Sequence, residues 1–204
     1  MIDFYTADTP NGKKVHLMLE ELGLPYTKHA VDLKSLEQKT PEFLSMNPNG
    51  RIPVIVDHEG PHKKAVTVFE SAAILYYLAE RHGQFIGHGL EEKAQTMQWV
   101  MFQMSAIGPM FGNYYYGMNS LHPKNPAYIE RFEKESHRLI GVMEMQLAKH
   151  KFLAGEEYTI ADICTYHWVA NFMKLVPDWF AASPSVRRWV HLVGERPAVK
   201  RVPA

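Results

Sequence analysis

The residues best suited to chemistry lie in one short segment near the start of the chain, Thr9-Pro10-Asn11-Gly12. Thr is a favoured N-cap and Pro a favoured first helical residue, so the segment predicts a helix start. The Thr9 hydroxyl, the Asn11 amide and unpaired backbone N–H groups would then meet at the positive end of that helix. Such an end stabilises an anion, for example the thiolate of a bound molecule. Taken alone, the segment is explained at least as well by helix capping.

A second candidate is the only cysteine, Cys164, which lies inside an apolar helix just after the segment Thr159-Ile160-Ala161-Asp162. A reactive thiolate needs a helix N-terminus or a nearby cation, and Asp162 opposes it. We therefore expect Cys164 to be a buried structural thiol. A single cysteine also excludes a Cys-x-x-Cys mechanism, a disulfide framework and a cysteine-rich metal site.

Other catalytic patterns are absent from the sequence. His58 and His62 share a loop without a His-Glu-x-x-His helix, so they indicate a polar turn and no metal site. The segment 47–50 (Asn-Pro-Asn-Gly) predicts a turn rather than a phosphate loop, and no Gly-x-Ser-x-Gly elbow occurs. The aromatic cluster 114–116 could stack on a ligand or simply pack in the core.

Composition excludes several classes of partner. Lys plus Arg and Asp plus Glu number 22 each, so the chain lacks the basic excess of a nucleic-acid binder. The N-terminus does not resemble a signal peptide, and we expect a cytoplasmic protein with no membrane partner. Residues 94–123 contain no Asp, Glu, Lys or Arg. Gln, Gly, Pro and Asn interrupt this segment, so we interpret it as buried in protein rather than in lipid.

The elements that would position these residues change in type along the chain. Strands are expected at 2–6 and 26–33, with a helix between them, which predicts a parallel βαβ unit. After the polar segment 34–43, a hairpin at 52–56 and 65–69 precedes a helix at 71–82. This order matches a thioredoxin-type sheet.

The second half of the sequence reads as helical. An apolar stripe runs from Ile129 to Leu147, a capping box opens a helix at Thr159, and Ser183-Pro184 begins another that Pro197 should stop. We therefore predict a thioredoxin-like α/β domain at 1–82, a linker at 83–89 and an all-α domain at 90–204.

Four segments in this order resemble the cytosolic glutathione transferases over nearly the whole chain. They are the strand entry 49–55 with a cis-proline, the turn 69–74, the helix cap 158–162, and Trp189 with 196–199. Ala7 stands where the tyrosine classes have their catalytic residue. Thr9-Pro10-Asn11-Gly12 is instead similar to the bacterial Nu class and to its relative, the fungal prion-forming nitrogen regulator, as are 31–33 with Gln38, and 128–131.

The resemblance implies a site for glutathione, whose parts suit these residues physically. The Glu70 carboxylate suits the glutamyl ammonium, while Ser71 and the N–H groups of the helix it opens suit the glutamyl carboxylate. Ile52, before Pro53, offers backbone groups for pairing with the extended tripeptide. Ser71 could also be a plain N-cap, and both roles can coexist.

The same resemblance assigns the remaining site residues. Gln38 and Arg51 would hold the glycine end, and Thr9 and Asn11 would donate to the sulfur. Arg131 would bind a carboxylate of a second glutathione, so that the site could hold oxidised glutathione. The alternative for Arg131 is an ordinary exposed charge on a helix.

The sequence thus predicts a glutathione-dependent enzyme of thiol–disulfide exchange, a disulfide-bond reductase with secondary transferase activity towards small electrophiles. Two alternatives stay open: a conventional glutathione transferase, and a non-catalytic glutathione-binding regulator on the same fold. The uncharged segment 94–123 predicts a homodimer, because interface cores are depleted of charge. A deep monomer core would explain it too.

Overall fold

The computed structural model describes residues 1–202, which fall into two compact units. Unit 1 comprises Met1–Gln84 and the C-terminal segment that begins at Pro197, and unit 2 comprises Phe85–Arg196. The sequence predicted one helical domain from residue 90 to the end. The last segment belongs to unit 1 instead, because α9 (Pro197–Arg201) packs on α1 (Pro10–Leu22). Pro197 therefore begins a helix, whereas we expected it only to stop one.

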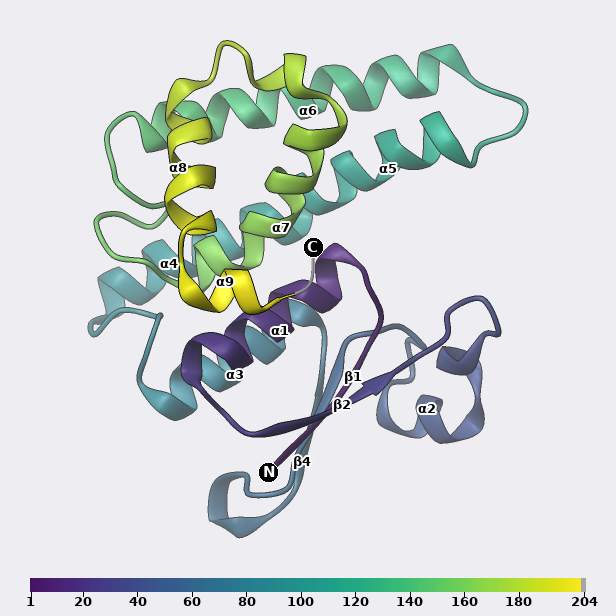
Figure 1. Cartoon of the computed structure of the whole chain (residues 1–204), viewed down its shortest axis with the longest axis vertical. Coiled ribbons are helices and arrows are strands. Elements are labelled where there is room, and N and C mark those ends of the chain that lie inside the picture. Colours follow the sequence, from purple (N-terminus) through teal and green to yellow (C-terminus); the bar gives the residue numbers. More distant parts are fainter. Residues whose placement is uncertain (203–204) are drawn as a thin grey trace. The chain divides into compact units, whose positions relative to one another are not determined.

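Unit 1 is built on a four-stranded sheet with the strand order β2-β1-β3-β4 (Figure 1). The strands are β1 (Ile2–Thr6), β2 (Tyr26–Ala30), β3 (Val54–Asp57) and β4 (Val66–Phe69). The pair β1 and β2 is parallel, as the helix between them requires, and the other two pairs are antiparallel. This arrangement confirms the predicted thioredoxin-type sheet.

Helices α1 and α3 (Ser71–His82) lie side by side in unit 1 (Figure 1). Thr9 caps the start of α1, and Gly23 ends it in the left-handed conformation at φ 61°. Helix α3 has the bounds that the sequence predicted. Two short helices that the sequence did not reveal begin in the predicted polar segment 34–43: η1 (Glu37–Lys39) and α2 (Pro41–Met46), which extends beyond it.

Strand register brings three chain segments to one end of the sheet. Tyr5 pairs with Val54 across β1 and β3, and Val54 pairs with Phe69 across β3 and β4. The residues that follow β1, precede β3 and follow β4 therefore emerge at the same end.

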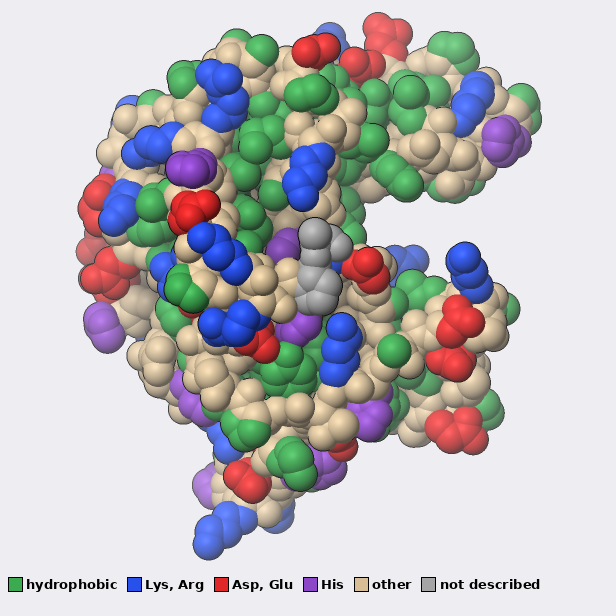
Figure 2. Space-filling model, in the orientation of Figure 1, with side chains coloured by type: hydrophobic (Ala, Val, Ile, Leu, Met, Phe, Trp, Pro, Cys, Tyr) green, Lys and Arg blue, Asp and Glu red, His purple; other side chains and the backbone are tan. Residues whose placement is uncertain are grey.

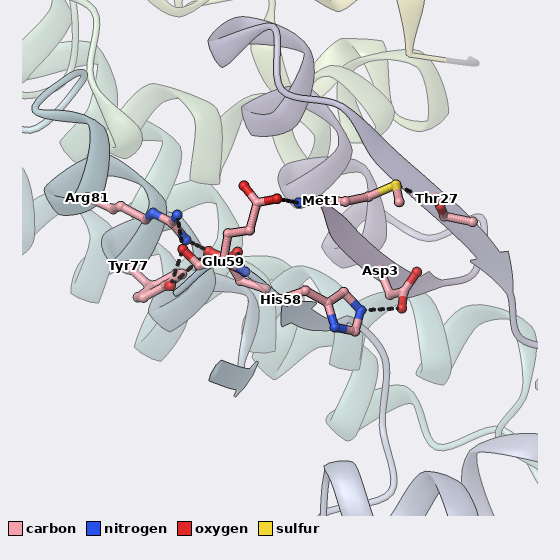
Figure 3. Close-up of polar contacts among 8 residues, drawn as sticks. Met1, Asp3, Thr27, His58, Glu59, Tyr77 and Arg81 are labelled. Carbon is pink, nitrogen blue, oxygen red and sulfur yellow. Dashed lines mark hydrogen bonds and ion pairs between the residues drawn. The ribbon is translucent and has the colours of Figure 1, made fainter. Parts of the chain in front are cut away.

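The opposite end of the sheet is held by a separate polar cluster (Figure 3). Arg81 forms an ion pair with Asp57, and the Tyr77 hydroxyl donates to the same carboxylate over 2.9 Å. His58 bonds Asp3 at 2.7 Å, tying the loop after β3 to the first strand. Ion pairs and hydrogen bonds within unit 1 account for these groups without a ligand.

Unit 2 is helical. Its main helices are α4 (Leu90–Phe102), α5 (Gly108–Asn119), α6 (Pro126–Leu147), α7 (Ile160–Leu175) and α8 (Pro184–Gly194). A π-helical segment, η3 (Gln103–Ile107), joins α4 to α5, and the 3-10 helix η4 (Pro177–Phe180) follows α7. Helix α7 lies at the centre of unit 2, since eleven of its sixteen residues are buried. The predicted capping box at its start, Thr159 with Asp162, is present.

Helices α6 and α8 cap each other. The Glu144 carboxylate on α6 accepts from the backbone N–H groups of Ser185 and Val186 at 3.1 and 2.9 Å. These are orphan donors at the start of α8. In return, the guanidinium of Arg188 on α8 donates to the carbonyl of Leu147, the last residue of α6. The negative end of one helix and the positive end of the other thus each meet a side chain of opposite charge.

The surface drawn in Figure 2 mixes acidic and basic side chains, in keeping with their equal numbers in the sequence. Among residues 1–202, no helix has both the length and the apolar character needed to cross a membrane.

Candidate functional site

The start of α1 supplies a hydroxyl at the sheet end described above. Thr9 is extended (φ −141°, ψ 157°), and its oxygen accepts from the Gly12 N–H at 3.1 Å. A hydroxyl that accepts in this way still has its own proton to donate. Asn11 is half-buried in the first turn. A Cβ on Gly12 would lie 2.4 Å from the carbonyl oxygen of Ala7, so only glycine lets the preceding loop fold onto the helix.

The start of α3 combines backbone strain with an uncapped helix end. Glu70 adopts φ 69° and ψ 117°, which non-glycine residues rarely do, and its side chain makes no capping bond to α3. The Glu70 carboxylate instead accepts from the Asn49 amide at 3.3 Å. Ser71, the first helical residue, is buried, and the Lys14 ammonium lies 3.5 Å from its hydroxyl oxygen. The backbone N–H groups of this first turn are suited to an anion.

The chain that leads into β3 is fixed by Asn47. Its side chain accepts from the Asn49 N–H at 2.9 Å and donates to the Arg51 carbonyl at 2.6 Å. The Ile52–Pro53 peptide is cis, as the sequence predicted. Ile52 is half-buried, and the Arg51 side chain is exposed. Backbone groups beside the sheet end and an exposed cation are thus both available to a ligand.

Gln38 contributes a buried polar atom. Its side-chain oxygen is buried and has no hydrogen-bond partner within residues 1–202. Buried polar atoms without partners are uncommon and call for an explanation. Because the amide can present either its oxygen or its nitrogen, Gln38 is suited to a polar ligand group.

Arg131 lies in unit 2, on an exposed part of α6. Its guanidinium carbon is 5.9 Å from the centre of the Phe132 ring. Both residues line a cavity of about 460 Å³, together with Met110, Lys134, Glu135 and Arg138. Arg138 is paired with Glu135 at 2.7 Å. The surface charge around Arg131 is therefore mixed.

Cys164 is fully buried, as expected, and its thiol lies 3.1 Å from the side-chain oxygen of Gln103. The aromatic cluster divides in two: Tyr114 packs on Trp179 with ring centres 4.5 Å apart, while Tyr115 and Tyr116 are about half exposed. Residues 1–202 contain no group of three or more acidic, histidine or cysteine side chains placed to hold a metal ion.

A chain of hydrogen bonds between titratable side chains joins α1 to Tyr26 on β2. The imidazole of His16 bonds the Tyr26 hydroxyl at 2.7 Å, and that hydroxyl donates to Glu20 at 2.8 Å. Burial, helped by the nearby Lys28, lowers the pKa of His16. Burial and Glu20 raise the pKa of Tyr26 to about 12. His16 is therefore neutral at pH 7.

The structure gathers most of the predicted residues at one end of the unit 1 sheet. Thr9 and Asn11 follow β1, Ile52 and Pro53 precede β3, and Glu70 and Ser71 follow β4. Arg131 belongs to unit 2. Sequence reasoning missed Lys14 and Asn49, which contact Ser71 and Glu70. Helical spacing did hold a signal for Lys14, which precedes Met18 by one turn and so shares its buried face.

Comparison with known proteins agrees with this geometry. The glutathione S-transferase N-terminal domain matches residues 9–81, and the C-terminal domain matches residues 96–197. Disulfide-bond oxidoreductase YfcG of Escherichia coli K12 is 41% identical over 199 residues, which cover 97% of this chain and 92% of that protein.

Solved structures are similar over the whole length. A Burkholderia graminis glutathione transferase, with two glutathione molecules bound per subunit, has a TM-score of 0.95 and 41% identity, covering 98% of this chain and 86% of that one. A Pseudomonas putida glutathione transferase, with one glutathione disulfide bound per subunit, has a TM-score of 0.90 and 39% identity, covering 100% and 92%.

A thioredoxin-type unit and a helical unit, with two helix starts suited to anions at one end of the unit 1 sheet, define a two-domain α/β plus all-α protein. The chain belongs to the glutathione transferase family. The similarity to a disulfide-bond oxidoreductase agrees with the resemblance to the Nu class.

Proposed function

We propose that this protein is a glutathione-dependent disulfide-bond reductase with a secondary glutathione transferase activity towards small electrophiles. The observation that carries the proposal is the pairing of two helix starts at one sheet end with a buried, lone cysteine. The chain's own sulfur is inaccessible, so the reacting thiol comes from glutathione. The identity to YfcG supports the same activity.

Glutathione would bind along the sheet end. Its glutamyl carboxylate meets Ser71 and the N–H groups of α3, and its ammonium meets Glu70. Its cysteinyl backbone pairs with Ile52 beside Pro53. The half-buried Gln38 amide and the exposed Arg51 side chain hold the glycine carboxylate. The Gln38 oxygen, which has no hydrogen-bond partner in the described part of the chain, supports this arrangement, since a ligand would complete its hydrogen bonding.

Thr9 and Asn11 would activate the sulfur. A free thiol has a pKa of about 8.5, and each unit of depression requires about 1.4 kcal/mol. One or two hydrogen bonds and the positive end of α1 together supply about that much. The Thr9 oxygen accepts a hydrogen bond from the Gly12 N–H, and this contact does not use the hydroxyl proton. The proton can therefore be donated to the glutathione sulfur.

The exchange proceeds in two balanced steps. The glutathione thiolate attacks one sulfur of a disulfide, forms a mixed disulfide and releases the other sulfur as a thiolate. A second glutathione thiolate attacks the mixed disulfide, so that oxidised glutathione and a second substrate thiol leave. Arg131 would bind a carboxylate of that second glutathione. Glutathione disulfide in the P. putida relative supports this requirement for two molecules.

We further propose that the protein acts as a homodimer in the cytoplasm. Met101, Tyr115, Tyr116 and Met118 lie in the uncharged segment 94–123 and are about half exposed. Exposed apolar side chains of this kind favour an interface over a deep monomer core.

Two substitutions test the mechanism in an assay with a small dialkyl disulfide. Cys164→Ala should retain most of the reductase activity, with a modest loss of packing. Asn11→Ala should lower turnover and raise the pKa of bound glutathione, read from thiolate absorbance against pH. An inactive but folded Cys164→Ala would refute the mechanism. Faster turnover of a chlorinated aromatic than of disulfides would indicate a conventional transferase instead.

A further inference from the structure

Lys14, on helix α1 of unit 1, is a charged residue in an unusually buried position. Its side chain is fully buried, a condition that lysine rarely meets without a polar partner. Helix α1 carries it on the face that packs against α3, and its ammonium lies 3.5 Å from the Ser71 oxygen. A charged group on α1 therefore lies next to the first residue of α3.

The direction of this contact matters. An ammonium group can only donate hydrogen bonds, so Ser71 must accept from Lys14. A hydroxyl that accepts from a cation is a stronger donor through its own proton. The backbone N–H groups at the start of α3 add partial positive charge at the same place. Both contributions are positive, so both favour an anion over a neutral group at the start of α3.

We infer that Lys14 is a positioning residue that makes the α3 start selective for the glutamyl carboxylate of glutathione. This inference rests on the proposed function and adds the source of its charge selectivity. Lys14 does not touch the ligand. It orients and polarises the Ser71 hydroxyl, and its field favours a carboxylate over a neutral group.

The test compares two ligands on three proteins. The ligands are glutathione and 4-aminobutyryl-cysteinyl-glycine, which lacks only the glutamyl carboxylate. The proteins are the wild type, Lys14→Met and the matched control Lys13→Met, which removes the same charge from the same helix. Titration calorimetry gives the affinities, and steady-state disulfide reduction gives KM and kcat.

Lys14→Met should weaken glutathione binding about tenfold and leave binding of the analogue nearly unchanged. KM for glutathione should rise, with kcat little affected. Lys13→Met should keep the wild-type preference between the two ligands. Combining Lys14→Met with Ser71→Ala should add little to either single change, because both act on one hydrogen-bonded unit.

A purely structural role of Lys14 would affect the binding of glutathione and of the analogue equally, whereas a positioning role changes the preference for glutathione. If Lys14→Met keeps the wild-type preference for the carboxylate, the inference is overturned while the proposed function stands. If the wild type binds neither ligand, both are overturned. If Lys14→Met does not fold, Lys14→Gln, which is polar but uncharged, makes the same comparison.

Discussion

The hydrogen bonds of the buried Asp162 carboxylate should contribute a large part of the free energy of unfolding of unit 2. Asp162 is fully buried at the start of α7 and accepts hydrogen bonds from three N–H groups. The donors are the backbones of Leu153 and Thr159, each at 3.0 Å, and the Trp189 indole at 2.8 Å. One side chain thus joins the loop before α7, the cap of α7 and the core of α8.

The magnitude follows from these three donors. Asp162→Ala leaves three buried N–H groups without this acceptor, at roughly 1–3 kcal/mol each, so the unfolding free energy should fall by at least about 3 kcal/mol. Trp189→Phe removes one donor and keeps the ring packing, so it should cost about 2 kcal/mol. Since whole domains are stable by roughly 5–15 kcal/mol, the first change should be severe.

Urea unfolding followed by far-UV circular dichroism measures both variants. Burial raises the pKa of Asp162 to about 6, above its ordinary value of 3.8. The folded protein therefore binds a proton more readily than the unfolded chain between these values. The contribution of Asp162 to stability should rise as pH falls through 6, and the gap to Asp162→Ala should be about 1 kcal/mol wider at pH 5 than at pH 7. A gap below 1 kcal/mol at pH 7 would refute the reasoning.

Three further predictions use other parts of the molecule. Arg131→Ala should weaken binding of oxidised glutathione more than of reduced glutathione in calorimetry, and equal losses would return Arg131 to an ordinary surface role. Tyr115→Glu should shift the protein towards monomers in analytical ultracentrifugation, whereas an unchanged dimer would place the interface elsewhere. Because the pKa of His16 is lowered in the folded state, the contribution of His16 to stability should fall as pH drops below 6.5, opposite in sign to that of Asp162. His16→Gln should remove part of that loss in urea titrations, and an unaltered pH profile would contradict it.

Much of the fold could be predicted because turn residues mark the ends of its elements. Thr9-Pro10 and Gly23 bound α1, and Gly83 ends α3 in the left-handed conformation. Helix α2 was missed because it is six residues long and buries only Phe43, which gives no periodic signal. Pro197 was misread because proline both stops one helix and suits the first turn of the next.

The site was predictable only where a local motif marks it. Thr9, Pro53 and Ser71 lie at a helix start or strand entry that the local sequence pattern predicts. Lys14 and Asn49 reach the site through contacts between elements distant in sequence. Helical spacing indicates that Lys14 is buried, but no local pattern indicates that it contacts Ser71. The roles of Gln38, Arg51 and Arg131 stay predictions, since they consist of contacts with a bound ligand.

The mutual capping of α6 and α8 has a consequence for how unit 2 opens. If α8 frays at its start, the Glu144 carboxylate loses its two backbone donors, and if α6 frays at its end, Arg188 loses its bond to the Leu147 carbonyl. Each helix end that loosens therefore removes at least one hydrogen bond from a charged side chain on the other helix. The amide protons of these two ends should therefore exchange with solvent at a common rate, as one cooperative unit, although some forty residues separate them in sequence.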